Sequence, residues 1–126
     1  MFNLVASLKN GVLIKKVFIY CKNNKKNEEL LNILWDEGFI IGYKKITAEN
    51  KNLYLKIFLK YNENQSSINS INFISKPGSR IYCSVKQLWK LNFVQGLIVL
   101  STSQGFKTLV ECKKLKLGGE LLLIVN

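Results

Sequence analysis

The stretch LIVLSTSQG, residues 97–105, changes abruptly from large apolar side chains to short hydroxyls and a glycine. The apolar part predicts a strand over residues 97–102, followed by a turn over residues 103–105. A second apolar run, residues 121–125, directly follows Gly118-Gly119-Glu120, so both polar segments are expected at strand ends. Hydroxyls can bind phosphates, sugars or base edges, and glycines allow a close backbone approach. By itself, such a cluster is more often a turn than a binding site.

The rest of the C-terminal half reads as short strands with two short helices. Strands are predicted over residues 71–75, 80–83 and 120–125, and Pro77-Gly78 is typical of the centre of a type II turn. A short helical segment is expected near residues 85–91. Thr108-Leu109-Val110-Glu111 has the spacing of a capping box, which predicts a further helix from residue 108.

The N-terminal half alternates between helix and strand patterns. Helices are predicted over residues 2–10, ending before Gly11, and over residues 24–37, with an asparagine N-cap and Gly38 after the end. Strands are predicted over residues 15–20, 39–41 and 53–61. Residues 62–67 contain no apolar side chain and are expected to link two lobes. The fold class is therefore α+β, with an α-β-α-β-β lobe over 1–64 and a mostly antiparallel β lobe over 65–126.

Composition points to a polyanionic partner. The 126 residues are 48% apolar, enough for one core or two small ones, and 19 basic against 8 acidic residues give a formal charge of +11 without any histidine. Arg80 is the only arginine, and lysine, asparagine and isoleucine abound, as expected from an AT-rich genome. Part of the lysine excess is then compositional. We expect an organelle or a reduced bacterium as the source, and no cleavable presequence.

The sequence contains no motif typical of a metal-binding protein, an enzyme or a membrane-surface protein. The three cysteines are isolated and lack histidine partners, so we expect no metal and no cofactor, with thiols that are buried or inert. Ser101 or Ser103 as a nucleophile would need a base, and no phosphate-binding glycine loop is present, so no enzyme is predicted. The helix over residues 24–37 begins with Glu28 and Glu29, which is atypical of a basic membrane-surface helix. Neither a membrane nor a small-molecule substrate is therefore expected as a partner.

Three blocks together carry a family resemblance: ISKPGSRIY at residues 74–82, STSQG at 101–105 and GGE at 118–120. Their order and spacing resemble those of small-subunit ribosomal protein 8 of the bacterial type, and DEGFI at residues 36–40 looks like another turn of that family. The resemblance covers nearly the whole chain. It implies a structural constituent of the small ribosomal subunit, without catalysis, that binds a central-domain stem of small-subunit rRNA and aids assembly and translation. The alternative is a free RNA-binding regulator of translation.

The resemblance also implies which residues bind RNA, most of them in the C-terminal lobe. They are Ser101, Thr102, Ser103, Gly105, Gly118, Gly119 and Glu120, with Tyr82 and the turn residues Lys76, Gly78 and Arg80 beside them. Lys25 occupies the position of the lysine in the family's Ser-Lys-x-Lys helix start and is the expected N-terminal contact. Glu120 is expected to orient hydroxyls or to accept from a base amino group.

The family further suggests partners, and the composition suggests a location. Small-subunit proteins 5 and 17 are the expected neighbours. A mitochondrial ribosome is the first expected location, with a plastid or the bacterial cytoplasm as alternatives. In one departure from the family, Lys116 replaces a glycine that ends a helix.

Overall fold

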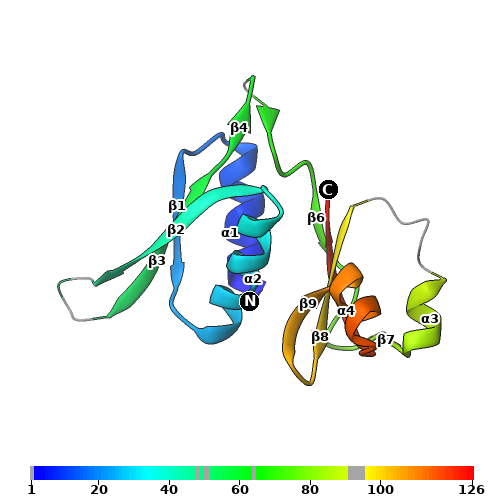
Figure 1. Cartoon of the computed structure of the whole chain (residues 1–126). Helices are drawn as coiled ribbons and strands as arrows, with labels where there is room; N and C mark the ends of the chain where they lie inside the picture. Colours follow the sequence, from blue (N-terminus) through cyan, green and yellow to red (C-terminus); the bar gives the residue numbers. More distant parts are fainter. Residues whose placement is uncertain (1, 48, 50–51, 64, 91–95) are drawn as a thin grey trace. The chain divides into compact units, whose positions relative to one another are not determined.

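The computed structural model describes residues 2–47, 49, 52–63, 65–90 and 96–126 (Figure 1). Contacts divide the chain into two compact units, Met1–Asn69 and Ser70–Asn126, called here the N-terminal unit and the C-terminal unit. The first unit contains helices and antiparallel strands in the order α-β-α-β-β, and the second is mostly antiparallel β with short helices. The predicted α+β class is confirmed.

The N-terminal unit is a three-stranded antiparallel sheet covered by two helices. The strands β1 (Phe18–Lys22), β3 (Leu53–Leu59) and β2 (Ile40–Thr47) lie in the order β1-β3-β2. The helices α1 (Phe2–Leu13) and α2 (Lys25–Asp36) pack on one face of this sheet (Figure 1). Apolar side chains from both layers form its core, among them Leu4, Leu8, Leu30, Leu34, Leu55 and Ile57.

Glycine 11 lies inside α1, so the predicted helix end at residue 10 is wrong. Gly11 is buried, and a Cβ there would meet Cγ2 of Ile19 at 2.7 Å. The glycine is therefore needed for the close approach of α1 to β1, and the packing outweighs its poor helix propensity. The second helix begins as predicted, because the Asn24 side chain accepts a hydrogen bond of 2.8 Å from the Asn27 N–H.

The polar segment 62–67, predicted as a link, partly folds into a two-stranded hairpin. Its strands are β4 (Tyr61–Asn62) and β5 (Gln65–Ser66). The Tyr61 hydroxyl donates a 2.6 Å hydrogen bond to the carbonyl of Lys16, which connects the hairpin to the rest of the N-terminal unit. Polar composition alone does not distinguish a surface hairpin from a linker, because both run over the protein surface.

The C-terminal unit is built on a five-stranded antiparallel sheet. The strands β6 (Ile71–Phe73), β10 (Gly119–Val125), β8 (Leu97–Thr102) and β9 (Gly105–Thr108) lie in that order, and β7 (Tyr82–Cys83) pairs with the start of β10. The helices α3 (Val85–Trp89) and α4 (Leu109–Leu115) share a core with this sheet, formed by Leu88, Ile98, Leu100, Cys112 and Leu121.

Strand β9 was not predicted, because residues 105–108 were assigned to a turn and to a helix start. Thr108 is the N-cap of α4, as predicted, and accepts a hydrogen bond from the Glu111 N–H. The predicted end of α3 at residue 91 lies outside the described residues. No helix in the described part of the chain is both long enough and apolar enough to cross a membrane.

Candidate nucleic-acid interface

Four strands of the C-terminal unit bring four side chains into one row. Ser101 of β8 lies opposite Glu120 of β10, Glu120 lies opposite Tyr82 of β7, and Ser101 also lies opposite Phe106 of β9. Directly opposed residues project from the same face of a sheet. Because Leu100 belongs to the core under the helices and successive side chains alternate, this row lies on the face away from α3 and α4. We call Tyr82, Glu120, Ser101 and Phe106 the four-strand row.

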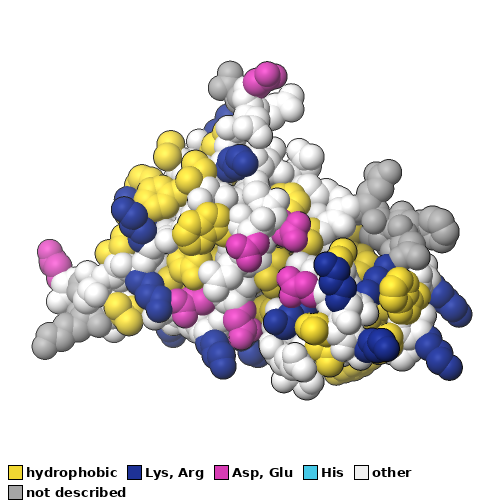
Figure 2. Space-filling view, in the orientation of Figure 1, with side chains coloured by type: hydrophobic (Ala, Val, Ile, Leu, Met, Phe, Trp, Pro, Cys, Tyr) yellow, Lys and Arg dark blue, Asp and Glu magenta, His cyan; other side chains and the backbone are white. Residues whose placement is uncertain are grey.

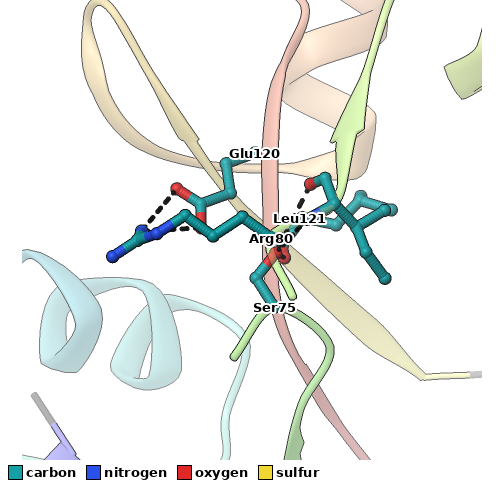
Figure 3. A network of polar contacts seen from close by, with 5 residues as sticks. Ser75, Arg80, Glu120 and Leu121 are labelled. Atoms are coloured by element: carbon teal, nitrogen blue, oxygen red, sulfur yellow. Dashed lines mark hydrogen bonds and ion pairs between the residues drawn. The ribbon is translucent and has the colours of Figure 1, made fainter. Parts of the chain in front are cut away.

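The acidic member of the row is paired with the chain's one arginine. Nη1 of Arg80 lies 3.1 Å from Oε1 and 3.4 Å from Oε2 of Glu120 (Figure 3). The Glu120 side chain is only 12% exposed, whereas that of Arg80 is 56% exposed. The guanidinium therefore offsets the carboxylate charge and stays accessible itself. A polyanion that approaches the row therefore meets the exposed guanidinium of Arg80, and the negative charge of Glu120 behind it is neutralised.

A buried serine holds the turn that carries Arg80 against β10. The Ser75 hydroxyl donates to the carbonyl of Leu121 and accepts a 3.0 Å hydrogen bond from the Ile81 N–H (Figure 3). The Leu121 N–H in turn donates to the Ile81 carbonyl at 2.9 Å. Ser75 is 5% exposed, so these bonds are shielded from water. This network positions Arg80 beside Glu120.

The predicted turn over residues 76–79 is present, but its type differs from the prediction. Lys76 and Ser79 exchange two backbone hydrogen bonds, of 3.1 and 2.9 Å. Gly78 has no positive φ, which a type II turn would require at that position, so the type II assignment is wrong. Lys76, Gly78 and Arg80 are all exposed. They lie on the segment that Ser75 ties to β10.

The hydroxyls of residues 101–103 have different surroundings. The Thr102 hydroxyl donates to the Gly105 carbonyl at 2.7 Å and accepts from the Gln104 N–H at 3.2 Å, so it stabilises the tight turn between β8 and β9. Gly105 has a φ of +99°, which favours glycine. Ser103 is exposed at the tip of this turn, and Ser101 is half-buried in the four-strand row.

Gly118 and Gly119 lie against the chain's own backbone. A Cβ at Gly119 would come within 2.4 Å of the Ser101 carbonyl oxygen, and one at Gly118 within 2.8 Å of the Cys83 carbonyl oxygen. Both glycines are thus needed for the pairing that brings β7, β8 and β10 together. The expected approach of RNA to these glycines stays a prediction.

The structure therefore brings most of the predicted site residues together on one part of the C-terminal unit. Lys25 is the exception, because it is the exposed first residue of α2 in the N-terminal unit. Phe106 and Ser75 were missed. Phe106 belongs to the unpredicted β9, and the signal for Ser75 was its place between the apolar Ile74 and the turn, where a short hydroxyl can satisfy buried backbone groups.

Charge is unevenly distributed over each unit. Five lysines lie on or next to α3 and α4 of the C-terminal unit: Lys86, Lys90, Lys113, Lys114 and Lys116. Figure 2 shows dark blue side chains in this region. Half of the eight acidic residues lie on or next to α2 of the N-terminal unit: Glu28, Glu29, Asp36 and Glu37. The same view shows magenta side chains in that region. The four-strand row itself offers a hydroxyl, an ion pair and two aromatic rings. Such groups suit sugars and base edges better than phosphates.

Two of the three thiols, those of Cys21 and Cys112, are buried, as expected. Burial raises the pKa of Cys21 to about 11 and also raises the pKa of Cys112, so both thiols are protonated at neutral pH. Cys83 is half-buried and packs against the core under α3 and α4. In the described part of the chain, no group of three or more His, Cys, Asp or Glu side chains lies close enough to hold a metal ion.

Comparisons with known proteins agree over the whole chain. Residues 1–126 match the family model described as Ribosomal protein S8. The small ribosomal subunit protein uS8 of Bartonella bacilliformis is 36% identical over 120 residues, which cover 95% of this chain and 91% of that protein. The uS8 protein of Thermus thermophilus is 34% identical, with coverage of 95% and 92%. The protein named uS8c of Gnetum parvifolium is 36% identical, with coverage of 98% and 95%.

Proposed function

This chain belongs to the ribosomal protein S8 family, and from that premise we propose that it is a structural component of the small ribosomal subunit. In this role it binds a stem in the central domain of small-subunit rRNA and aids assembly of the subunit. The observation that carries the proposal is the four-strand row, in which Ser101 lies between an aromatic ring and a glutamate whose charge is offset by Arg80. The net charge of +11 favours the same partner.

The row and its turn suit the shallow groove of an RNA stem. An A-form helix displays 2′-hydroxyls and base edges there, whereas its deep major groove is closed to side chains. Short hydroxyls at Ser101 and Ser103 reach such groups with little loss of side-chain entropy. Thr102 contributes by holding the turn through its bond to the Gly105 carbonyl. The 66% exposed ring of Tyr82 is available to pack on a sugar or a base.

Two serine substitutions test this site directly. Each lost hydrogen bond costs about 0.5–1.5 kcal/mol, so we expect Ser101→Ala with Ser103→Ala to weaken binding of the central-domain stem about tenfold or more. The slope of affinity against salt stays unchanged, because no phosphate contact is removed. Both quantities are measured by titrating labelled stem RNA at several salt concentrations.

The matched control is Thr47→Ala, which removes an exposed hydroxyl at the end of β2 in the N-terminal unit. It is expected to leave the affinity for the stem unchanged. An equal loss in the control and in the serine variant would contradict the assignment of the site. A shallower salt slope in the serine variant would point to phosphate contacts instead.

Crosslinking in the source cells separates the ribosomal role from the regulatory alternative. Recovery of one stem of small-subunit rRNA, crosslinked at residues 101–105 and 118–120, is the expected result. Recovery of a messenger RNA with a similar stem would favour a free regulator of translation. The same preparation tests proteins 5 and 17 of the small subunit as proposed neighbours, and the 55% exposed Trp89 of α3 is the contact that we propose for them.

We place the protein in a mitochondrial ribosome, on the argument that the excess of lysine, asparagine and isoleucine reflects an AT-rich organellar genome. Detection of the protein with the small subunit in purified mitochondria would support this location. Detection in plastids, or in a bacterial cytoplasm, would overturn it without affecting the ribosomal role.

A further inference from the structure

One face of the N-terminal sheet is not covered by α1 or α2. Side chains alternate along β1 and β3, so that Ile19, Cys21, Leu55 and Ile57 are buried while their neighbours are turned away from the helices. The strand register groups these neighbours on what we call the outer face: Phe18, Tyr20 and Lys22 of β1, Tyr54, Lys56 and Phe58 of β3, and Lys44 of β2.

Aromatic rings and ammonium groups alternate on this outer face. The Lys56 Nζ lies 4.1 Å from the centroid of the Phe18 ring and 5.4 Å from that of Phe58. The Lys44 Nζ lies 5.9 Å from the Phe58 centroid, and the rings of Phe18 and Tyr20 meet edge to face at 5.5 Å. The rings of Phe18, Tyr20 and Phe58 thus each have a positive charge or a second ring beside them. Phe18 is 38% and Tyr20 53% exposed, although large aromatic side chains are usually more buried.

The charge of this face is entirely positive. None of the three strands contains an acidic residue, and the acidic cluster of the unit lies on α2, which packs on the other face. Lys45, the neighbour of Lys44, points to that other face and forms a 2.8 Å ion pair with Glu28 of α2. On the helix side of the sheet, the charge of Lys45 is therefore neutralised by Glu28. On the outer face, Lys44 and Lys56 have no acidic residue on their own strands.

Two grooves border the outer face along β1. One, of about 640 Å³, lies between α1 and the first half of β1 and is lined by Asn10, Gly11 and residues 16–20, among others. The second, also about 640 Å³, lies at the other end of the strand and includes Lys22 and Tyr54. Outer-face residues line both grooves, Phe18 and Tyr20 in the first and Lys22 and Tyr54 in the second.

We propose that the outer face of the N-terminal sheet binds an unpaired stretch of RNA. Bases stack on Phe18, Tyr20 and Phe58, and phosphates lie against Lys44 and Lys56. A base that stacks on the Phe18 ring displaces the Lys56 ammonium from that ring. Because the Lys56 side chain is flexible, the displaced ammonium can then contact the phosphate of the same nucleotide. This proposal goes beyond the proposed function, because it assigns a second surface in the other unit and a different form of RNA.

Charge complementarity favours RNA over a protein partner. Protein interfaces are typically depleted of lysine at their centre, whereas the centre of this face is Lys56 between two phenylalanine rings. Aromatic rings interleaved with basic side chains on a sheet are typical of binding to single-stranded nucleic acid, since every base offers a stacking surface. A protein strand added along β1 is the alternative outcome of the experiment below.

The experiment uses the full chain and a fluorescent eight-nucleotide RNA without secondary structure. Loss of a stacked base costs about 1–3 kcal/mol, so Phe18→Leu with Phe58→Leu is expected to weaken binding of this oligonucleotide at least fivefold. Leucine keeps most of the apolar contact with the sheet, which protects the fold. The control Trp35→Leu removes an exposed ring of α2, on the other side of the sheet, and should leave the affinity unchanged.

A second pair of variants tests the charges independently of the rings. Lys44→Gln and Lys45→Gln are neighbours on one strand and change the net charge equally, but only Lys44 lies on the outer face. We expect Lys44→Gln to weaken oligonucleotide binding and to reduce its salt slope by about one, and Lys45→Gln to change neither. Equal effects of both variants would overturn the proposal.

The remaining outcomes are also decisive. Binding of the same sequence in a duplex as tightly as in the single strand would contradict a stacking surface. No binding of the oligonucleotide would overturn the proposal, and pairing of an added peptide strand with β1 would then assign the outer face to a protein partner. Affinity for the central-domain stem is measured in every variant and is expected to stay unchanged, so failure of this proposal is distinguishable from failure of the proposed function.

Discussion

Lys116 ends α4 in a backbone conformation that usually needs glycine. Its φ and ψ are +56° and +45°, and its N–H donates to carbonyls of the last turn of the helix. We expect Lys116→Gly to raise the free energy of unfolding by about 0.5–1 kcal/mol, because glycine adopts this conformation without steric cost. Urea unfolding followed by circular dichroism measures the change.

The control for this substitution is Lys114→Gly. Lys114 is exposed within the same helix and loses the same charge, but its backbone is helical. Glycine there is expected to lower the stability by about 1 kcal/mol. If both variants were destabilised alike, the strain assigned to Lys116 would be absent.

The residues of the site illustrate what a sequence reveals of chemistry. Ser101, Thr102 and Ser103 were grouped by their adjacency in the chain, yet Thr102 stabilises the turn while Ser101 faces Glu120 on a neighbouring strand. The pairing of Glu120 with Arg80 was not predicted, because forty positions separate them and they are brought together by the register of β7 and β10 and by the hydrogen bonds of Ser75. Residue types and strand ends were predictable, but cross-strand partners depend on a register that local patterns do not determine.

Among the elements, β10 depends on a glycine at its start. A Cβ at Gly119 would lie 2.4 Å from the Ser101 carbonyl oxygen, closer than atoms of paired strands approach. We expect Gly119→Ala to push β8 and β10 apart and to lower the free energy of unfolding by about 1–3 kcal/mol. The same change should weaken binding of the rRNA stem, because it displaces Ser101.

Gly78→Ala is the matched control in the same unit. A Cβ at Gly78 meets no atom within 4 Å, and its φ is not positive, so the variant is expected to be neutral or stabilised by up to about 1 kcal/mol. Unfolding of both variants in urea, followed by circular dichroism, tests the contrast. If Gly119→Ala left the stability unchanged, the backbone at the start of β10 would be able to shift away from Ser101 without cost, and the requirement for glycine would be contradicted.

Two of the errors in the predicted elements share a physical cause. Gly11 and β9 were misjudged because a tertiary contact overrode the local signal: in α1 the close packing of Gly11 on Ile19, and in β9 the pairing of residues 105–108 with β8. Where the pattern was long and strongly periodic, as in α2 and β3, the prediction was confirmed within a few residues. Short strands are stabilised mainly by their partners, so their own sequence carries little signal.

At the scale of the whole molecule, the net charge of +11 has opposite effects on folding and on binding. Repulsion among the lysines destabilises the free protein, and added salt screens it, since the Debye length falls from about 30 Å at 0.01 M to about 8 Å at 0.15 M. We therefore expect the melting temperature of the free protein to rise by a few degrees over this range. Affinity for the rRNA stem should fall over the same range, because counterion release then contributes less.

A variant with fewer charges tests whether repulsion is the cause. Lys86→Gln, Lys90→Gln and Lys114→Gln together change exposed side chains on or next to α3 and α4, and they lower the net charge from +11 to +8, since 11 minus 3 is 8. This variant should melt at a higher temperature in low salt and respond less to added salt. A response as large as that of the unchanged chain would mean that salt acts through apolar burial, because that contribution does not depend on the number of lysines.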